Sequence, residues 1–458
     1  MKKKLLIAAI ILGACGAVAF PLLNLVIPLP DSRLASLQVD DPVTAAALQV
    51  LEAKCVHCHT SEIQLPWYGV LPVAKQILEY DMYTGLKHSD FMRVFFPEEE
   101  QPVDQVTLAK IEYTTENRSM PPAAYLLMHW NHRMSADDDA ALLAWIEQER
   151  KEHHVLPGIN PDTMFKGMQP LPESVETDPV KVTLGQKLFH DVRLSKNDTV
   201  SCATCHDLGK GGTDQLKFSK GVGNAVGTIN SPTVFNSVFQ FAQFWDGRAV
   251  DLADQADGPV NDPAEMASNW KQIIEKLDED DAFQEEFLAA YPEGYSKETF
   301  TNAIAEYEKT LLTPAPWDDF LKGDESALSD VQKAGFQHFQ DLGCYTCHTG
   351  VLLGGCSYEL MGLRRDYYRD RGNVVEADYG RFNETKDEYD RFRLKTPTLR
   401  NIALTFPYFH DGTVETLEEA VDSMVKYQVG KKAQASQTAE IVEFLNSLTG
   451  SFQGVPLQ

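Results

Sequence analysis

Six of the eight cysteines in this 458-residue chain fall in three copies of one short pattern, Cys-x-x-Cys-His. The copies occupy residues 55–59, 202–206 and 344–348, so they recur at nearly equal intervals along the chain. A motif that recurs at a regular interval indicates a repeated structural unit. We therefore expect three units, each organised around one copy of the motif.

The pattern suits covalent attachment of haem c. The two thiols add to the haem vinyl groups as thioethers, and the adjacent imidazole is then held against the iron as its proximal ligand. A zinc site would need CxxC pairs close together in the sequence, and a redox dithiol would leave the histidines unexplained. We expect three haem c groups per chain. Their attachment residues would be Cys55, Cys58, Cys202, Cys205, Cys344 and Cys347, and their proximal ligands His59, His206 and His348.

The second axial ligand of each iron decides whether a haem only transfers electrons or also binds a small molecule. Met120 is followed by Pro121 and Pro122, a rigid extended segment that can present the thioether to the iron of the first haem. We expect Met120 to be that ligand, with packing in a core as the alternative. Cys356 lies outside the three motifs and is expected to be a buried thiol.

The segments around the motifs carry helical patterns. Ahead of the second and third copies a Gly and a Phe lie four residues apart, and each unit closes with an aromatic residue three positions after an aliphatic one. These pairs are Gly185/Phe189 and Gly335/Phe339, then Leu142/Trp145, Ile304/Tyr307 and Ile441/Phe444. An entry helix, a haem motif and a closing aromatic helix resemble the cytochrome c fold. No alternating apolar pattern is long enough for a substantial sheet.

The fold class we predict is therefore mostly α, with three cytochrome c-like haem domains. The segment rich in Pro, Gly and Asp at residues 156–179 and the prolines at 314 and 316 break the helical pattern and indicate linkers. The predicted domains are residues 31–155, 156–320 and 321–458, behind an N-terminal anchor or signal at residues 1–30.

The N-terminus indicates export. Three lysines precede a nearly unbroken apolar stretch from Leu5 to Ile27, which is long enough to cross a bilayer as a helix. The alternative is a cleaved signal, because residues 12–15 resemble the lipobox at which bacterial lipoproteins are cut and acylated on cysteine, here Cys15. The apolar run continues past Cys15, which favours the uncleaved anchor. Both interpretations tether the protein to the inner membrane, facing the periplasm.

The formal charge of −26 disfavours nucleic acid as a partner, because phosphates would be repelled over the whole surface. A small, membrane-dissolved or cationic partner fits better. The aromatic, apolar segment from Leu65 to Tyr83 is a candidate for contact with such a partner, although ordinary core packing is the favoured interpretation there.

From about Thr183 to the C-terminus, the chain resembles the bacterial di-haem cytochrome c peroxidases. The stretches that carry this resemblance occur in family order and are residues 231–236 (SPTVFN), 244–248 (FWDGR), 263–266 (PAEM), 397–401 (PTLRN) and 407–412 (PYFHDG), together with Gln255. The additional haem unit and the apolar N-terminus resemble the tri-haem branch described as quinol peroxidases.

The resemblance implies a role for each matching residue. The haem on His206 would be the peroxidatic centre, and the haem on His348, closed by Met424, would be its electron-transferring neighbour. Trp245 would lie between the two haems. A calcium ion would sit nearby, bound by Asn230 and by the backbone carbonyls of Thr405 and Pro407.

Glu265 and Gln255 would line the peroxide pocket. Heterolysis of the O–O bond needs a group that takes a proton from one peroxide oxygen and delivers it to the other, and a carboxylate can do both. An amide can orient peroxide without titrating. In many di-haem peroxidases a loop histidine closes the peroxidatic iron until the partner haem is reduced. Val222 stands at that place here, so we expect an open iron that needs no reductive activation.

The function that we expect is reduction of hydrogen peroxide to water with electrons from the membrane quinol pool. One alternative is a non-catalytic multihaem electron carrier. A second is a peroxidase that uses a soluble cytochrome c as its donor. A third is a protein-oxidising di-haem enzyme of the same superfamily, but that branch has Tyr where Met424 stands here.

Overall fold

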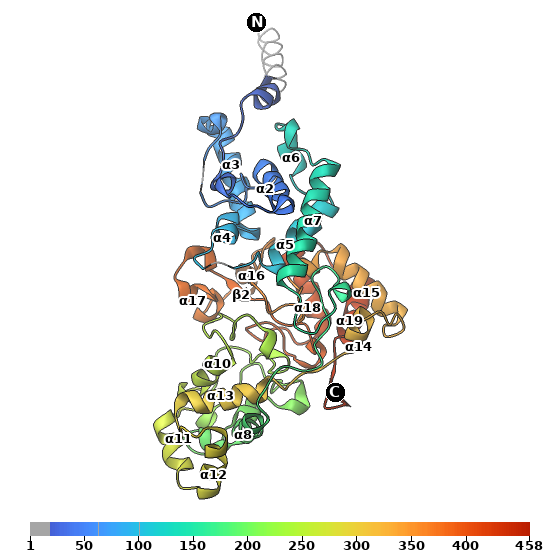
Figure 1. Cartoon of the computed structure of the whole chain (residues 1–458). Helices are drawn as coiled ribbons and strands as arrows, with labels where there is room; N and C mark the ends of the chain where they lie inside the picture. Colours follow the sequence, from blue (N-terminus) through green and yellow to red (C-terminus); the bar gives the residue numbers. More distant parts are fainter. Residues whose placement is uncertain (1–18, 63, 100) are drawn as a thin grey trace. The chain divides into compact units, whose positions relative to one another are not determined.

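The computed structural model describes residues 19–62, 64–99 and 101–458, which form two compact units, Met1–His154 (unit 1) and Val155–Gln458 (unit 2). The chain is mostly helical, as predicted (Figure 1). Unit 1 holds the first haem motif, whereas unit 2 holds the second and third. The division of unit 2 into two domains stays a prediction.

No helix in the described part of the chain is both long and apolar enough to cross a membrane. The predicted anchor, Leu5–Ile27, falls largely on residues 1–18, which lie outside the described residues. The last part of that stretch, residues 19–26, is helical.

Unit 1 is built around the crossing of helices α2 and α7. Asp41 begins α2 by accepting a hydrogen bond from the backbone of Thr44, and Ser135 and Asp138 form a capping box at the start of α7. The core beneath the crossing contains Trp145. The helices are α2 (Pro42–Lys54), α3 (Pro72–His88), α4 (Phe91–Phe95), α5 (Gln105–Glu116), α6 (Ala123–Leu126) and α7 (Ala136–His153), with short 3-10 turns η1 (Arg33–Ser36), η2 (Trp67–Val70) and η3 (Trp130–His132).

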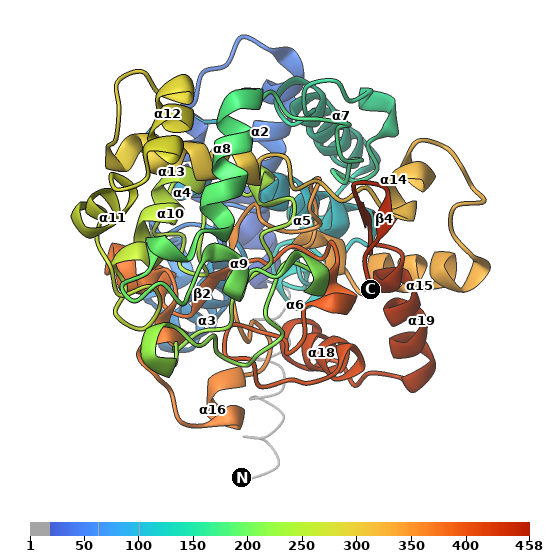
Figure 2. The same ribbon diagram turned by 90° about the horizontal axis from the view of Figure 1, so that it is seen from below.

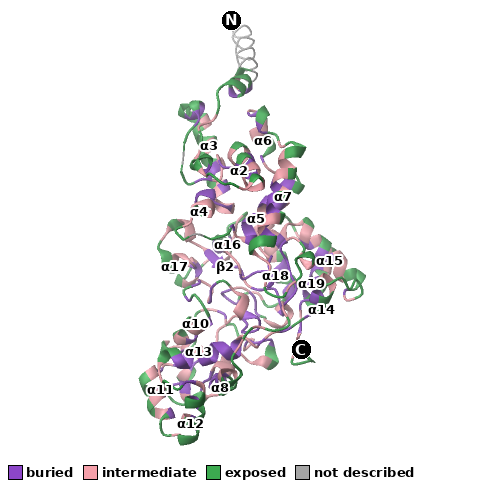
Figure 3. Ribbon diagram, viewed as in Figure 1, coloured by how far each residue is buried: buried purple, intermediate pink, exposed green. Residues whose placement is uncertain are grey.

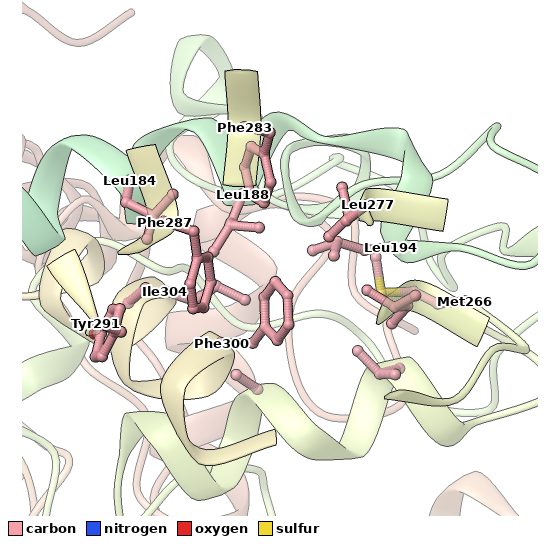
Figure 4. Packing of buried hydrophobic residues seen from close by; sticks show 14 of the residues in the cluster. Leu184, Leu188, Leu194, Met266, Leu277, Phe283, Phe287, Tyr291, Phe300 and Ile304 are labelled. Carbon is pink, nitrogen blue, oxygen red and sulfur yellow. The ribbon is translucent and has the colours of Figure 1, made fainter. Parts of the chain in front are cut away.

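The first half of unit 2 contains the second haem motif. Its entry helix α8 packs against the closing helix α13, which Figure 3 shows to be largely buried. Phe287 and Phe300 lie in the middle of the core beside them, with their ring centroids 4.7 Å apart (Figure 4). The helices are α8 (Pro179–His190), α9 (Cys202–Cys205), α10 (Leu252–Asn261), α11 (Trp270–Leu277), α12 (Asp281–Ala290) and α13 (Lys297–Glu308).

The second half repeats the crossing with α15 and α19, which lie side by side next to α18 (Figure 2). Its helices are α14 (Pro316–Leu321), α15 (Asp330–Asp341), α16 (Tyr367–Arg371), α17 (Phe382–Thr385), α18 (Leu417–Met424) and α19 (Ala435–Asn446), with the π-helical turn η13 (Val425–Val429) after α18. Two small antiparallel pairs, β1 (Tyr358–Leu360) with β2 (Arg393–Lys395) and β3 (Ser451–Phe452) with β4 (Val455–Pro456), are the only sheets in the described residues.

Glycines allow both crossings in unit 2. A Cβ atom on Gly185 would lie 1.9 Å from the carbonyl oxygen of Ala303, and one on Gly335 would lie 1.8 Å from that of Glu440. Neither distance leaves room for a methyl group, so any larger residue would force the helices apart. The Gly and Phe pattern in the sequence therefore reports a close contact between entry and closing helices.

Candidate haem and peroxide site

The three motif histidines share one geometry. The Nδ1 atom lies 3.1 Å from the Ser89 carbonyl oxygen in His59, 3.3 Å from that of Gly212 in His206 and 3.1 Å from that of Leu353 in His348. A carbonyl oxygen can only accept, so Nδ1 carries the proton and Nε2 keeps the lone pair that binds a metal. Burial also lowers the pKa of each imidazole, to about 4 in His348, which favours the neutral ligand form.

The motif cysteines also fit haem attachment. No disulfide joins the seven described cysteines, although each motif holds two thiols within one short turn. Burial raises the pKa of the Cys58 and Cys205 thiols to about 11. Two thiols and an adjacent histidine in one short segment are the set of groups that haem c attachment uses. Cys356 is half-buried, with its Sγ atom 3.8 Å from the carbonyl oxygen of Thr349.

Glu265 is a half-buried carboxylate in the second haem region. It follows α10 in the chain, and burial raises its pKa to about 6; Asp262 adds to this effect and Arg248 opposes it. Its backbone oxygen accepts a hydrogen bond of 2.7 Å from the backbone of Val222. Gln255 lies half-buried on α10. The glutamate and the loop that contains Val222 are therefore in direct contact.

Hydrogen bonds between backbone groups within residues 217–230 hold the shape of this loop. Gly221 donates to Ala225 at 2.8 Å and Gly227 donates to Ser219 at 3.1 Å. A Cβ atom on Gly221 would lie 2.1 Å from the Ala264 carbonyl oxygen, so only glycine lets the loop approach Glu265 this closely. Val222 packs against the apolar core, whereas Lys217 and Lys220 are exposed.

Arg248 is a site residue to which sequence reasoning gave no role. Its guanidinium lies 3.5 Å from the centroid of the Phe244 ring and is also held by Asp246 at 3.0 Å. Its positive charge lowers the pKa of Glu265 and so partly offsets burial. The matching stretch at residues 244–248 contained the signal, because it includes a cation three positions after Trp245, the residue expected between the haems.

Trp245 is fixed from two sides. Its indole Nε1 donates to the backbone oxygen of Asn230 at 2.8 Å, and its own backbone oxygen accepts from the backbone of Lys395 at 2.8 Å. Its ring centroid lies 6.1 Å from that of His410. The ring of Trp245 therefore contacts the segments of Asn230 and His410, and its backbone is bonded to strand β2.

The expected calcium ligands lie on adjoining segments. Asn230 donates from its backbone to the carbonyl oxygen of His410 at 2.8 Å and from its side-chain amide nitrogen to the Leu216 carbonyl at 2.9 Å. The backbone bond joins Asn230 to the chain segment that contains Thr405 and Pro407. An all-oxygen set of amide and backbone carbonyls is the chemistry that calcium prefers.

A buried network of charges beside Trp245 was missed by sequence reasoning. Asp378 accepts a hydrogen bond of 2.8 Å from the His410 imidazole, and Arg371 forms ion pairs with both Asp378 and Asp411. Although burial opposes ionisation, the hydrogen bonds from His410 and Arg371 hold the pKa of Asp378 well below its usual range. Arg371 supplies the positive charge that this cluster of metal-ligating residue types needs.

The two candidate methionine ligands occupy different settings. Met424 ends α18, where the helix passes into the π-helical turn η13, and packs, as Trp245 does, against a cluster that contains Tyr367 and Tyr427. Such π turns often occur at functional sites. Met120 lies half-buried in the loop between α5 and α6. Both stay proposals as iron ligands.

Unit 1 has a second feature that the sequence did not reveal. The Nδ1 atom of His129 lies 3.1 Å from the Tyr125 carbonyl oxygen and must donate to it, so Nε2 accepts the hydroxyl of Tyr68 at 2.6 Å. Both side chains are buried, and burial lowers the pKa of His129. The pair joins η2 to the segment between α6 and η3.

Comparison with known proteins places these features in a family. The di-haem cytochrome c peroxidase model matches residues 179–326, and a haem-binding domain model matches residues 29–148. The chain is 48% identical over 404 residues to the cytochrome c peroxidase Ccp of Escherichia coli K12, which covers 88% of this chain and 86% of that protein. It is 44% identical over 271 residues to the cytochrome c551 peroxidase of Pseudomonas aeruginosa, covering 58% and 78%.

A solved structure agrees with these matches. The crystal structure of a MauG-like protein associated with microbial copper homeostasis has a TM-score of 0.54 and 26% identity over 64% of this chain and 94% of that one. The E. coli match spans more residues than unit 2 contains, so it extends into unit 1. The chain therefore belongs to the di-haem cytochrome c peroxidase family and is a haem peroxidase.

Proposed function

We propose that this protein is a tri-haem peroxidase of the periplasm, anchored to the inner membrane, which reduces hydrogen peroxide to water with electrons from the quinol pool. The observation that carries this proposal is the half-buried carboxyl group of Glu265, whose pKa is raised to about 6 and whose backbone accepts a hydrogen bond from Val222, the residue at the position of the expected axial histidine. When bound, the haems supply the redox centres that bind peroxide and carry electrons.

The protein residues provide the proton chemistry. Ionised Glu265 accepts the proton of the peroxide oxygen nearer the iron and returns it to the oxygen that leaves as water. Its raised pKa suits both steps at neutral pH, because the group can be charged before the transfer and neutral during it. Gln255 orients peroxide through its amide, and the positive charge of Arg248 opposes the rise in the pKa of Glu265.

The other half of unit 2 would hold the haem that passes electrons to the peroxide site. His348 and Met424 would hold a six-coordinate haem, which accepts and releases electrons without binding peroxide. Trp245 is fixed by hydrogen bonds on both its ring and its backbone, so it suits a rigid position between the two haems. The proposed calcium ion, held by Asn230, Thr405 and Pro407, would keep this position fixed.

His59 and Met120 would hold the third haem, in unit 1. Its place near an apolar N-terminus supports a donor dissolved in the membrane, which is why quinol is proposed over a soluble cytochrome c. The acidic chain would still suit a basic cytochrome, so the donor needs a direct comparison.

The test is steady-state peroxide consumption by the purified full-length protein with a quinol and, separately, with reduced cytochrome c. We expect turnover with quinol to exceed turnover with cytochrome c. Deleting the chain up to about Leu156 should abolish quinol-driven turnover, while peroxide still oxidises the reduced di-haem core. Full quinol activity in the truncated protein would contradict the proposed entry route, and turnover only with cytochrome c would contradict the donor.

A further inference from the structure

Unit 1 exposes a row of apolar side chains along one side of helix α3. Val73, Ile77, Tyr80 and Tyr83 recur at helical spacing and are 70%, 56%, 67% and 60% exposed. Val70, just before the helix, is 80% exposed. We call these five residues, with Leu71, the α3 face. Core packing was the favoured interpretation of this segment from sequence, but these side chains do not lie in a core.

The opposite side of α3 packs on the first haem motif. Met82 and Gly85 are buried there, and a Cβ atom on Gly85 would lie 2.1 Å from the carbonyl oxygen of Cys58. Figure 3 shows α3 mainly as exposed and intermediate, and its exposed polar side chains include the ion pair of Lys75 and Glu79. Only the thickness of this one helix separates the α3 face from a haem-binding cysteine.

The α3 face continues into the N-terminal helix at residues 19–26. The Phe20 ring lies 5.2 Å from that of Trp67 and 5.0 Å from that of Tyr68, measured between centroids. Asn24 donates to the Met128 carbonyl at 2.9 Å and accepts from the Trp67 indole at 3.2 Å. These contacts attach the end of the apolar N-terminal run to the part of unit 1 that presents the α3 face (Figure 1).

Charge and residue type both suit a lipid surface. The segment at residues 65–88 carries two lysines and two acidic residues, although the whole chain has a net charge of −26. An anionic membrane would therefore repel this segment less than it would repel the rest of the chain. The segment exposes the aromatic side chains of Trp67, Tyr80 and Tyr83. Trp130, elsewhere in unit 1, is 48% exposed. Tyr and Trp are enriched where proteins meet the interface of a bilayer.

We propose that the α3 face lies on the lipid bilayer and that unit 1 thereby holds its haem motif against the membrane. This inference rests on the proposed anchor, because an N-terminal helix in the bilayer brings the attached surface to the headgroups. An apolar patch of this extent on a soluble surface marks an interaction site. A quinol could then reach the side of unit 1 nearest Cys58 without leaving the lipid.

The test uses the full-length holoprotein in vesicles of phosphatidylcholine and phosphatidylglycerol. A photoreactive benzoylphenylalanine replaces Ile77, and a matched variant carries it at Val331, which is 50% exposed on α15 in unit 2. After irradiation, mass spectrometry measures lipid adducts on each variant. We expect about fivefold more lipid adduct at position 77 than at position 331, because an interfacial face lies within the acyl boundary. Haem content confirms that both variants are folded.

Each outcome decides the matter. Equal adducts at the two positions, or a crosslink between two copies of the chain at position 77, would overturn the proposal. Flotation of the vesicles reports the anchor separately, so a protein that fails to float contradicts the proposed function before the face is tested. The yield of lipid adduct at position 77 does not depend on turnover, so this test remains valid even if the electron donor is not a quinol.

Discussion

The two halves of unit 2 are built on the same crossing of helices but surround their haem motifs differently. In each half a glycine of the entry helix lies against a carbonyl of the closing helix, Gly185 on α13 and Gly335 on α19. In each half an aromatic pair follows that crossing, with ring centroids 5.3 Å apart for Phe189 and Tyr307. The corresponding pair, Phe339 and Phe444, is 5.2 Å apart.

The two halves differ in the side chains that their loops place around the haem motif. The half around His206 presents Glu265 and a loop with Val222, whereas the half around His348 presents Met424 among aromatic side chains. In the proposed function, the shared crossing would serve haem attachment, and the loops would decide whether each iron reacts or only carries electrons. Four predictions follow this contrast, from the largest expected effect to the smallest.

Replacing Glu265 by Gln should have the largest effect. The substitution keeps the size of the side chain and removes the group that carries the proton, so peroxide turnover should fall by about 10²- to 10⁴-fold. Glu275→Gln changes an exposed side chain on α11 in the same half; it is the control and should keep parent activity. Haem absorption spectra should be unchanged in both. A Glu265 variant with more than half the parent rate would remove this residue from the mechanism.

Val222→His should make the first half resemble the second by offering an axial ligand. We expect the high-spin signal of the oxidised protein in electron paramagnetic resonance to fall and the initial rate with peroxide to drop by about tenfold, with a lag that pre-reduction removes. Val226→His places a histidine on the same loop at a side chain that is 55% exposed, and it should change neither. A parent protein with only low-spin haems would contradict the open site.

The pH dependence should follow Glu265. Burial raises its pKa to about 6, and the carboxyl group must be ionised to accept the proton of peroxide. The value of kcat/KM should therefore be constant above about pH 7 and fall about tenfold for each unit below pH 6. The Glu265→Gln variant should lose this dependence while keeping its low rate. A parent profile that is flat down to pH 4.5 would show that another group moves the proton.

The features that sequence could predict are those that lie close together along the chain. The haem motifs, the Gly and Phe pairs and the mostly helical fold needed only short spacings. The Arg371, Asp378 and His410 network could not be predicted, because its members come from separate segments that only folding brings together. The exposure of Ile77 was also missed, since an apolar helical stripe has the same pattern on a core as on a membrane surface.

The smallest effect concerns the crossing that the two halves share. Gly185→Ala and Gly335→Ala each place a methyl group less than 2 Å from a carbonyl oxygen of the closing helix, so the helices must separate. Each should lower the free energy of unfolding of the holoprotein by about 2 kcal/mol, measured from the urea midpoint. Gly227→Ala, whose Cβ atom would lie 3.7 Å from its nearest neighbour, is the control and should change stability by less than about 0.5 kcal/mol. Because the two crossings are alike, equal losses would support a common scaffold beneath different haem chemistry. A large loss in only one half would mean that the other crossing can adjust, and that the halves differ in their helices as well as in their loops.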